Sequence, residues 1–395
     1  MSTGSRSLLR TRGGHDSGRV GMVELFFDLV FVFAVTQLSH SLLAHLDAAG
    51  ALRTGFLLLA VWWVWIYTSW VTNWLDPEKI PVRLMLFALM LAGLVLSASI
   101  PKAFAQQGAA FALAYAAMQV GRTAFMLWAA RGEPVLRNNF QRILIWLAIS
   151  AVLWIAGGFS EGDARWAFWV PAMALEIVSP MLYFWVPGLG RSSTADWNVD
   201  GSHLSERCAL FVIIALGESL LVTGATFAGV ETLGTSQALA FASAFVGSVA
   251  MWWIYFDTGA ERAHHRIVHS NDPGRQARSA YTYFHVPIVA GIIVCAVSDE
   301  LVLVHPDHAD DVGIAVILAG PALYLVGTAL FKWVTNDRII PPLSHLAGLA
   351  LLAALAWPAF AHAFSALQLG LLTTAVMVLV ATWETLALRR PAKAR

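Results

Sequence analysis

The sequence has few charged residues and almost no cysteine. Only 13% of its 395 residues are charged, against about 25% in an ordinary soluble domain, and 25 basic residues balance 25 acidic ones. Because there is no excess of basic residues, the composition excludes a nucleic-acid-binding protein with a broad positive surface. The two cysteines, Cys208 and Cys295, lie in separate apolar stretches, so the sequence predicts neither a disulfide framework nor a CxxC metal site.

The common signatures of enzymes and cofactor sites are also missing from the chain. The sequence contains no Walker loop, no GxSxG nucleophile elbow, no Rossmann fingerprint and no haem attachment motif. We therefore expect a protein that is not an enzyme and that carries no cofactor.

What the sequence has in abundance is apolar surface. Hydrophobic residues make up 58% of the chain, which includes 17 Trp and 22 Phe. A soluble protein of this composition would have too few polar residues to cover its surface. The composition therefore predicts a polytopic membrane protein whose partner is the lipid bilayer, with a small ion or solute as a further candidate partner.

Twelve apolar stretches are long enough to cross a bilayer, which takes about 20 residues of α-helix. Residues 1–20 do not qualify, because they combine arginines with Gly and Ser, and we interpret them as a polar tail and not as a cleaved signal peptide. The predicted spans are residues 22–45, 53–75, 82–100, 104–130, 140–158, 165–186, 205–227, 236–258, 279–302, 311–333, 340–361 and 364–388.

The basic residues predict the orientation of these spans, because Lys and Arg concentrate in cytoplasmic loops. If the N-terminal tail and every second loop face the cytoplasm, that side holds 21 of the 25 basic residues. The predicted fold class is therefore an all-α polytopic membrane protein of about 12 transmembrane helices with both termini in the cytoplasm.

The two halves of the chain resemble each other. The stretch WWVWIYTSWVTN at 62–73 is similar to MWWIYFDTGAER at 251–262, and Glu176 is matched by Glu384. Because each half would contain six spans, the halves would have the same orientation in the membrane. The predicted organisation is a cytoplasmic tail (1–20), a first six-helix repeat (21–187), a cytoplasmic linker (188–203), a second, parallel six-helix repeat (204–390) and a basic cytoplasmic end (391–395).

Ionisable residues inside the spans are the candidate functional residues. Each costs on the order of 2.5–3.5 kcal/mol on membrane-insertion scales, so it normally faces a partner or water. Glu24 and Asp28 are four residues apart on one face of the first span, and Glu218 lies near the bilayer centre in the seventh. The other candidates for a substrate or ion pathway are Gln37, Arg122, Glu176, Glu206 and Arg207.

The sequence leaves two interpretations of these residues open. In the functional one, mid-membrane carboxylates such as Glu218 and Glu176 change protonation as their access to water changes, as in a proton-coupled carrier. In the structural one, the carboxylates form permanent pairs with Arg122 or Arg207 that hold helices together. We favour the functional interpretation for Glu218 and Glu176, and the structural one for carboxylates near the membrane surface.

A second polar cluster follows the predicted eighth span. Its residues recur every four positions, so they would form one stripe if the helix continued, and such side chains can bind a divalent metal. The pattern is not HExxH and supplies no obvious catalytic base, so we favour a solvated helix end over a metal site. The weak metal candidates are Asp257, Glu261, His265 and His269.

Two longer motifs resemble a known family. VELFFDLVFVFAVTQLSH at 23–40 and SERCALFVIIALGESLL at 205–221 are similar to the two signatures of the bacterial low-temperature-requirement protein A (LtrA) family. The resemblance implies a multi-pass protein of the bacterial plasma membrane that is linked by name to growth in the cold and has no established reaction. The residues that match the two signatures are Glu24, Phe27, Asp28, Gln37, Glu206, Arg207, Gly217 and Glu218.

The leading hypothesis for function is a transporter or ion pathway with Glu218 and Glu176 at its centre and Glu24 and Asp28 near its inner mouth. The alternative is a structural or sensing protein that transports nothing and responds to the state of the membrane. A metal-dependent membrane enzyme that uses the stripe at 257–269 is a weaker alternative.

Overall fold

The computed structural model describes residues 7–10, 19–193, 200–230, 234–257, 278–335 and 340–389. Within these residues the chain forms twelve α-helices and no β-strand. The helices are α1 (Met22–Ala44), α2 (Ala48–Thr72), α3 (Ile80–Ser99), α4 (Gly108–Ala129), α5 (Pro134–Phe159), α6 (Ala164–Val178), α7 (Gly201–Ala228), α8 (Thr235–Phe256), α11 (His285–Val304), α12 (Asp311–Thr335), α13 (Leu343–Phe360) and α14 (Ala366–Arg389).

Eleven of the twelve described helices are long and apolar enough to cross a membrane. Short helical turns lie at the ends of some of these helices. They are the 3-10 turns Ile100–Lys102 and Ala130–Gly132, and a π-helical turn at Arg278–Tyr283 just before α11. Proline begins α5 at Pro134, where its missing N–H would have no helical partner in any case. The prediction of a multi-span, all-helical membrane protein is thus confirmed.

Helix α6 is the exception among the expected spans. The sequence predicts a span over 165–186, but the helix ends at Val178. Its 15 residues rise about 22 Å at ~1.5 Å per residue, less than the ~30 Å of a hydrocarbon core. Ser179 and Pro180 follow Val178, and beyond them Tyr183 and Phe184 adopt left-handed backbone conformations, with φ of 53° and 48°.

The described helices belong to two compact units. The first contains most of α1 and α2, all of α3–α6 and the start of α7, and the second contains the rest of α7 with α8 and α11–α14. The division falls between Arg207 and Cys208, inside α7. Helix α7 begins at Gly201, within the segment 188–203 that the sequence predicts as a linker. The parallel repeats and the cytoplasmic termini stay predictions.

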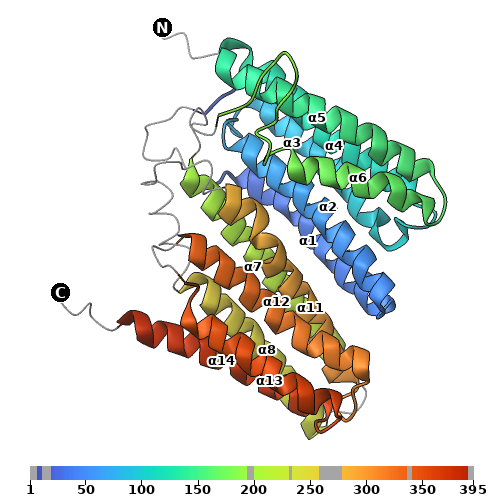
Figure 1. Ribbon diagram of the computed structural model, residues 1–395, viewed down its shortest axis with the longest axis vertical. Helices are drawn as coiled ribbons and strands as arrows, with labels where there is room; N and C mark the ends of the chain where they lie inside the picture. Colours follow the sequence, from blue (N-terminus) through green and yellow to red (C-terminus); the bar gives the residue numbers. More distant parts are fainter. Residues whose placement is uncertain are drawn as a thin grey trace. The chain divides into compact units, whose positions relative to one another are not determined.

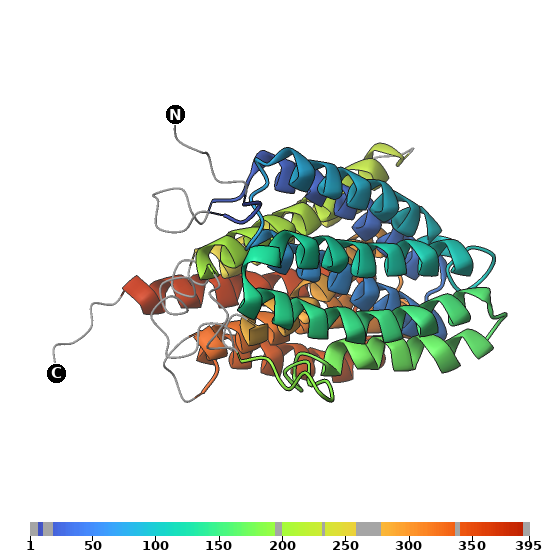
Figure 2. The same ribbon diagram turned by 90° about the horizontal axis from the view of Figure 1, so that it is seen from above.

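The first unit packs α3, α4, α5 and α6 side by side, as Figures 1 and 2 both show. Aromatic rings fill the space between α4, α5 and α6: the ring centroids of Trp154 and Trp169 are 5.3 Å apart, and those of Phe111 and Trp169 are 5.5 Å apart. All three side chains are buried. This aromatic core surrounds the buried carboxylate of Glu176, described below.

The second unit depends on a close approach between α11 and α12. A Cβ atom added to Gly320 would lie 2.8 Å from the backbone nitrogen of Cys295, and one added to Gly291 would lie 2.7 Å from the Cα of Tyr324. Only glycine permits this spacing on both helices. Helix α14 packs against α8 and α13 in the same unit (Figure 1).

Candidate functional site: buried carboxylates of the two units

In the first unit, Glu24 and Asp28 of the first signature motif meet Arg207 of the second. Glu24 and Asp28 lie one turn apart in α1 and are fully buried. Arg207, at the start of α7, donates to Asp28 Oδ1 through Nη2 at 2.7 Å, and its Nη1 lies 3.4 Å from Glu24 Oε1. One guanidinium therefore faces both carboxylates.

Glu24 has two further partners that the sequence analysis missed. Arg10 donates from Nη2 to Glu24 Oε2 at 2.7 Å, and His203 Nε2 lies 2.8 Å from Glu24 Oε1. The Arg10 Nε in turn donates to the backbone carbonyls of Thr72 and Leu75. The N-terminal segment is thus anchored at the cluster. No local pattern in the polar tail indicates that Arg10 reaches it.

Asp28 receives a second donor from the tryptophan-rich helix α2. Trp65 Nε1 donates to Asp28 Oδ1 at 2.8 Å, and the Arg207 guanidinium lies over the ring of the same tryptophan, 5.6 Å from its centroid. We call the set Arg10, Glu24, Asp28, His203 and Arg207 the inner cluster. Two carboxylates face two guanidinium groups in it, so its charges balance, which supports the structural interpretation.

Asp200 helps to hold His203 at the inner cluster. Its carboxylate accepts the backbone N–H groups of Ser202 at 2.9 Å and His203 at 3.3 Å, at the start of α7. The side chain of Asn73 pairs with both backbone groups of Asp200, at 2.7 and 2.9 Å. Burial alone would raise the pKa of the Asp200 carboxyl, but the hydrogen bonds from Ser202 and His203 outweigh it and lower the pKa.

Glu176 sits in a closed polar pocket of the first unit. Four neutral groups donate to its buried carboxylate: the Tyr115 hydroxyl at 2.7 Å, Gln119 Nε2 at 2.6 Å, the Ser150 hydroxyl at 2.6 Å and Trp154 Nε1 at 3.1 Å. Among the described residues, no cationic side chain forms an ion pair with it. The sequence analysis identified Glu176 but none of these donors.

Arg122 reaches Glu176 only through an intermediate. Its Nη2 donates to Gln119 Oε1 at 2.5 Å, and the amide nitrogen of that glutamine donates to Glu176. Nη1 of Arg122 donates to the Val64 carbonyl at 3.2 Å and the Thr68 hydroxyl at 3.1 Å, both in α2. The direct pair between Arg122 and a carboxylate that the structural interpretation suggested is replaced by an amide bridge.

Glu218 differs from the buried carboxylates Glu24, Asp28 and Glu176 of the first unit. It lies in the part of α7 that belongs to the second unit, and only 4% of its surface is exposed. Within the described chain it forms no hydrogen bond and no ion pair. The buried hydroxyl oxygens of Ser219 and Thr223, its neighbours in α7, also have no hydrogen-bond partner among the described residues.

The two remaining pathway candidates lie apart from these groups. Glu206 is exposed, and its Oε2 accepts the backbone N–H of Val20 at 3.2 Å. Gln37 is half-buried in α1, and its side chain forms no hydrogen bond within the described residues.

The predicted metal stripe falls mostly on residues that the structure does not describe. Glu261, His265 and His269 lie outside the described residues. Asp257 is described, and its Oδ2 accepts a hydrogen bond from the Thr385 hydroxyl at 2.9 Å. In the described ranges no group of three or more His, Cys, Asp or Glu side chains is placed to bind a metal.

The second unit contains a buried ion pair. Lys332 Nζ in α12 lies 2.6 Å from Glu384 Oε2 in α14, and it also donates to the Ile254 carbonyl at 2.6 Å. The sequence analysis noted Glu384 only as the counterpart of Glu176. Its partner could have been found from the position of Lys332, which is a lysine inside an apolar stretch.

Comparison with known proteins finds one matching family and one similar relative. The family described as "Bacterial low temperature requirement A protein (LtrA)" matches residues 19–382. An uncharacterized protein of Rhizobium meliloti (strain 1021) is 44% identical over 378 residues, which cover 95% of this chain and 91% of that protein. No solved structure matches the chain. The matched region contains both signature motifs. It also contains Glu218 and, separately, Glu176 with its four donors.

Proposed function

Since the chain belongs to the bacterial low-temperature-requirement A family of membrane proteins, and buries a carboxylate without a partner in α7, we propose that it is a transporter or ion pathway whose flux depends on Glu218. We further propose that it acts in the bacterial plasma membrane with both termini in the cytoplasm.

The observation that carries this proposal is the polar stretch of α7. Burial of a carboxylate without a partner costs free energy, which a bound proton or cation removes. Buried hydroxyl groups without a partner also need an explanation, and an ion or water molecule passing them is one. Glu218 is 4% exposed, and the buried hydroxyl oxygens of Ser219 and Thr223 lie within two turns of it on the same helix.

The comparison with other hydroxyl groups of the chain sharpens the point. Thr68 in α2 and Ser97 in α3 each donate to the backbone carbonyl four residues earlier, at 2.8 Å. This is the usual way in which a hydroxyl group is satisfied inside a membrane helix. Ser219 and Thr223 do not use it, so their oxygen atoms stay available to an ion or to water.

The carboxylates of the first unit take other roles in this proposal. Glu24 and Asp28 are compensated by Arg207 and Arg10, so we assign the inner cluster to the anchoring of helix ends and not to ion passage. Glu176 has four neutral donors, and a change in its charge would disturb the amide bridge to Arg122. We therefore assign Glu176 a secondary role in flux.

Flux measurement in proteoliposomes tests the proposal. Purified protein is reconstituted with a pH-sensitive dye inside the vesicles, and proton flux is recorded under gradients of Na⁺ and K⁺. We expect Glu218→Gln to abolish flux, because it removes the ionisable group and keeps the side-chain size. Glu161→Gln is the matched control, since Glu161 is exposed in the loop between α5 and α6.

Two outcomes of the flux measurement would contradict the proposal. If Glu218→Gln inserts and folds normally and carries the same flux as the unchanged protein, the assignment of Glu218 is wrong. If the unchanged protein carries no flux, while substitutions in the inner cluster lower stability, the structural or sensing role is favoured. The compensated charges of the inner cluster are the observation that supports this second candidate.

We also infer that the two units are copies of one six-helix repeat. In the first unit a basic residue of α4, Arg122, is linked to an acidic residue of α6, Glu176, through Gln119. In the second, a basic residue of α12, Lys332, pairs with an acidic residue of α14, Glu384. The matching pattern, base on the fourth helix and acid on the sixth, supports a duplication.

A further inference from the structure

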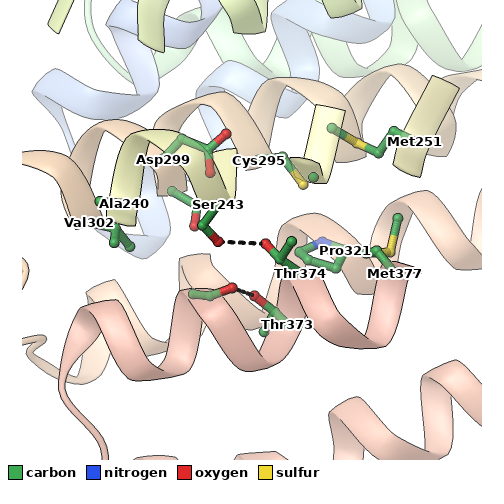
Figure 3. A pocket seen from close by; sticks show the side chains of 13 residues that line it. Ala240, Ser243, Met251, Cys295, Asp299, Val302, Pro321, Thr373, Thr374 and Met377 are labelled. Carbon is green, nitrogen blue, oxygen red and sulfur yellow. Dashed lines mark hydrogen bonds between the residues drawn. The ribbon is translucent and has the colours of Figure 1, made fainter. Parts of the chain in front are cut away.

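A cavity in the second unit lies outside every group discussed so far. Residues of α8, α11, α12 and α14 line it, and Figure 3 shows their side chains. It has about 30 Å³ of space for the centres of water molecules, which is enough for a small ion or water but not for an organic solute. Its polar lining residues are Ser243, Cys295, Ser298, Asp299, Thr373 and Thr374.

Asp299 is the charged group of this cavity. Its side chain is half-buried and forms no hydrogen bond or ion pair with a described residue. The described residues that line the cavity include no lysine or arginine, so nothing in the lining balances the carboxylate. The sequence analysis did not single out Asp299, because it lies near the end of a predicted span where a polar residue can reach the membrane surface.

Two of the hydroxyl groups of the cavity, those of Ser243 and Thr373, present lone pairs and not protons. Ser243 uses its proton on Thr374 Oγ1, at 3.0 Å, and Thr373 uses its proton on the carbonyl of Gly370, also at 3.0 Å. The oxygen atoms of Ser243 and Thr373 can therefore act only as electron-pair donors toward the cavity. An arrangement of one carboxylate and hydroxyl oxygen atoms attracts a cation and repels an anion.

The contributing residues lie at similar depth in the unit. Ser243 and Thr374 are each eight residues past the start of their helices, α8 and α14, or about 12 Å along the axis at ~1.5 Å per residue. Asp299 lies five residues before the end of α11, about 8 Å from the same end of the unit. The three oxygen-bearing side chains thus belong to one layer.

We propose that this cavity binds one small monovalent cation, with Asp299 as the charged ligand and the oxygen atoms of Ser243, Thr373 and Thr374 as neutral ligands. One carboxylate balances one positive charge, which favours a monovalent ion over a divalent one. The ligands are hard oxygen atoms, which suit an alkali cation. The site is separate from Glu218, and its occupancy does not depend on the flux proposed above.

The test is a binding measurement on the full-length protein. The chain in lipid nanodiscs is titrated with NaCl, KCl and LiCl at constant ionic strength, with choline chloride as the replacement salt. The tryptophan emission records the melting temperature, Tm. We expect at least one of the three ions to raise Tm with a saturable dependence on concentration, because a ligand that binds only the folded state stabilises it.

Variants locate the effect at the cavity. Asp299→Asn should abolish the saturable rise in Tm, and Thr374→Val should weaken apparent affinity at least tenfold while leaving the carboxylate in place. Asp307→Asn is the matched control, because Asp307 is exposed in the loop between α11 and α12. If Asp299→Asn does not fold, Asp299→Glu and Ser243→Ala take its place in the titration. Each is expected to lower the apparent affinity for the cation.

Several results would overturn the proposal. It is wrong if none of the three cations raises Tm beyond the effect of choline chloride, or if Asp299→Asn and Thr374→Val keep the full rise. It is also wrong if only Ag⁺ raises Tm and Cys295→Ala removes that rise, because the sulfur atoms of Met251, Cys295 and Met377 would then be the ligands. Glu218→Gln should keep normal cation binding, so this test and the flux test can fail independently.

Discussion

Arg207 is the residue on which the charge balance of the first unit depends. It is fully buried and faces both Glu24 and Asp28. Glu24 has a second cationic partner in Arg10 and a hydrogen-bond partner in His203, whereas Asp28 has only Arg207 as its cationic partner among the described residues. Removal of the guanidinium would therefore leave Asp28 as a buried charge without compensation.

We expect Arg207→Met to lower the free energy of unfolding by about 3–5 kcal/mol, the usual cost of breaking a buried ion pair from one side. The double variant Arg207→Met with Asp28→Asn should recover part of this loss, because it also removes the uncompensated charge. Unfolding by SDS in mixed micelles measures both values. Arg137→Met is the control, since Arg137 is exposed in α5.

Equal stability of the single and double variants would contradict this account, since it would mean that the Asp28 charge is compensated by other groups. At this scale the sequence identified the acidic residues and Arg207 but not Arg10 or His203. A carboxylate inside an apolar stretch is conspicuous, whereas a partner that arrives from a polar tail carries no local mark.

At the scale of elements, the interface between α11 and α12 is set by backbone contact. We expect Gly320→Ala to lower the free energy of unfolding by about 1–3 kcal/mol, because the added Cβ would meet the Cys295 backbone and push the helices apart. Gly121→Ala in α4 is the matched control: nothing lies within 4 Å of an added Cβ there, so it should be neutral or stabilising.

Unfolding in mixed micelles compares the two variants directly. If Gly320→Ala and Gly121→Ala change the free energy of unfolding equally, the change reflects helix propensity and not contact between α11 and α12. Gly320 is also close to the Asp299 cavity, whose lining includes its neighbour Pro321. We therefore expect the Gly320→Ala variant, in which α12 is displaced, to bind the cation more weakly in the Tm titration described above.

The helices themselves could be predicted well from the sequence, apart from α6. Long apolar runs bounded by polar residues and proline define a membrane helix locally. The early end of α6 did have a local signal, because Ser179 and Pro180 follow Val178 and a proline just past a helix favours its end. The predicted span extends to residue 186 because Met181 and the residues after it are apolar again.

At the scale of the whole molecule, the orientation in the membrane is the property to test. The distribution of basic residues predicts that loops at Glu161 and Asp307 face outward and that the loop at Glu78 faces the cytoplasm. We expect a membrane-impermeant maleimide to label Glu161→Cys and Asp307→Cys on intact cells. Glu78→Cys should react only after permeabilisation.

All three positions are exposed in the structure, so access by the reagent and not burial decides the labelling. The native Cys208 and Cys295 are buried and supply a low background. Labelling of Glu78→Cys on intact cells would contradict the predicted orientation and, with it, the predicted place of Glu24 and Asp28 near the inner mouth of the pathway.

The sequence by itself determined the class of the protein, most of its helices and the candidate carboxylates Glu24, Asp28, Glu176 and Glu218, though not Asp299, because hydrophobicity and charge are properties of single residues and of short segments. The tertiary structure alone decided which of these carboxylates are compensated. Asp28 and Glu24 meet Arg207 from a distant helix, Glu176 meets four neutral donors, and Glu218 and Asp299 meet no donor among the described residues. Which side chain meets which carboxylate depends on helices far apart in the chain, so a local pattern can mark a candidate such as Arg207 or Lys332 but cannot assign the pair.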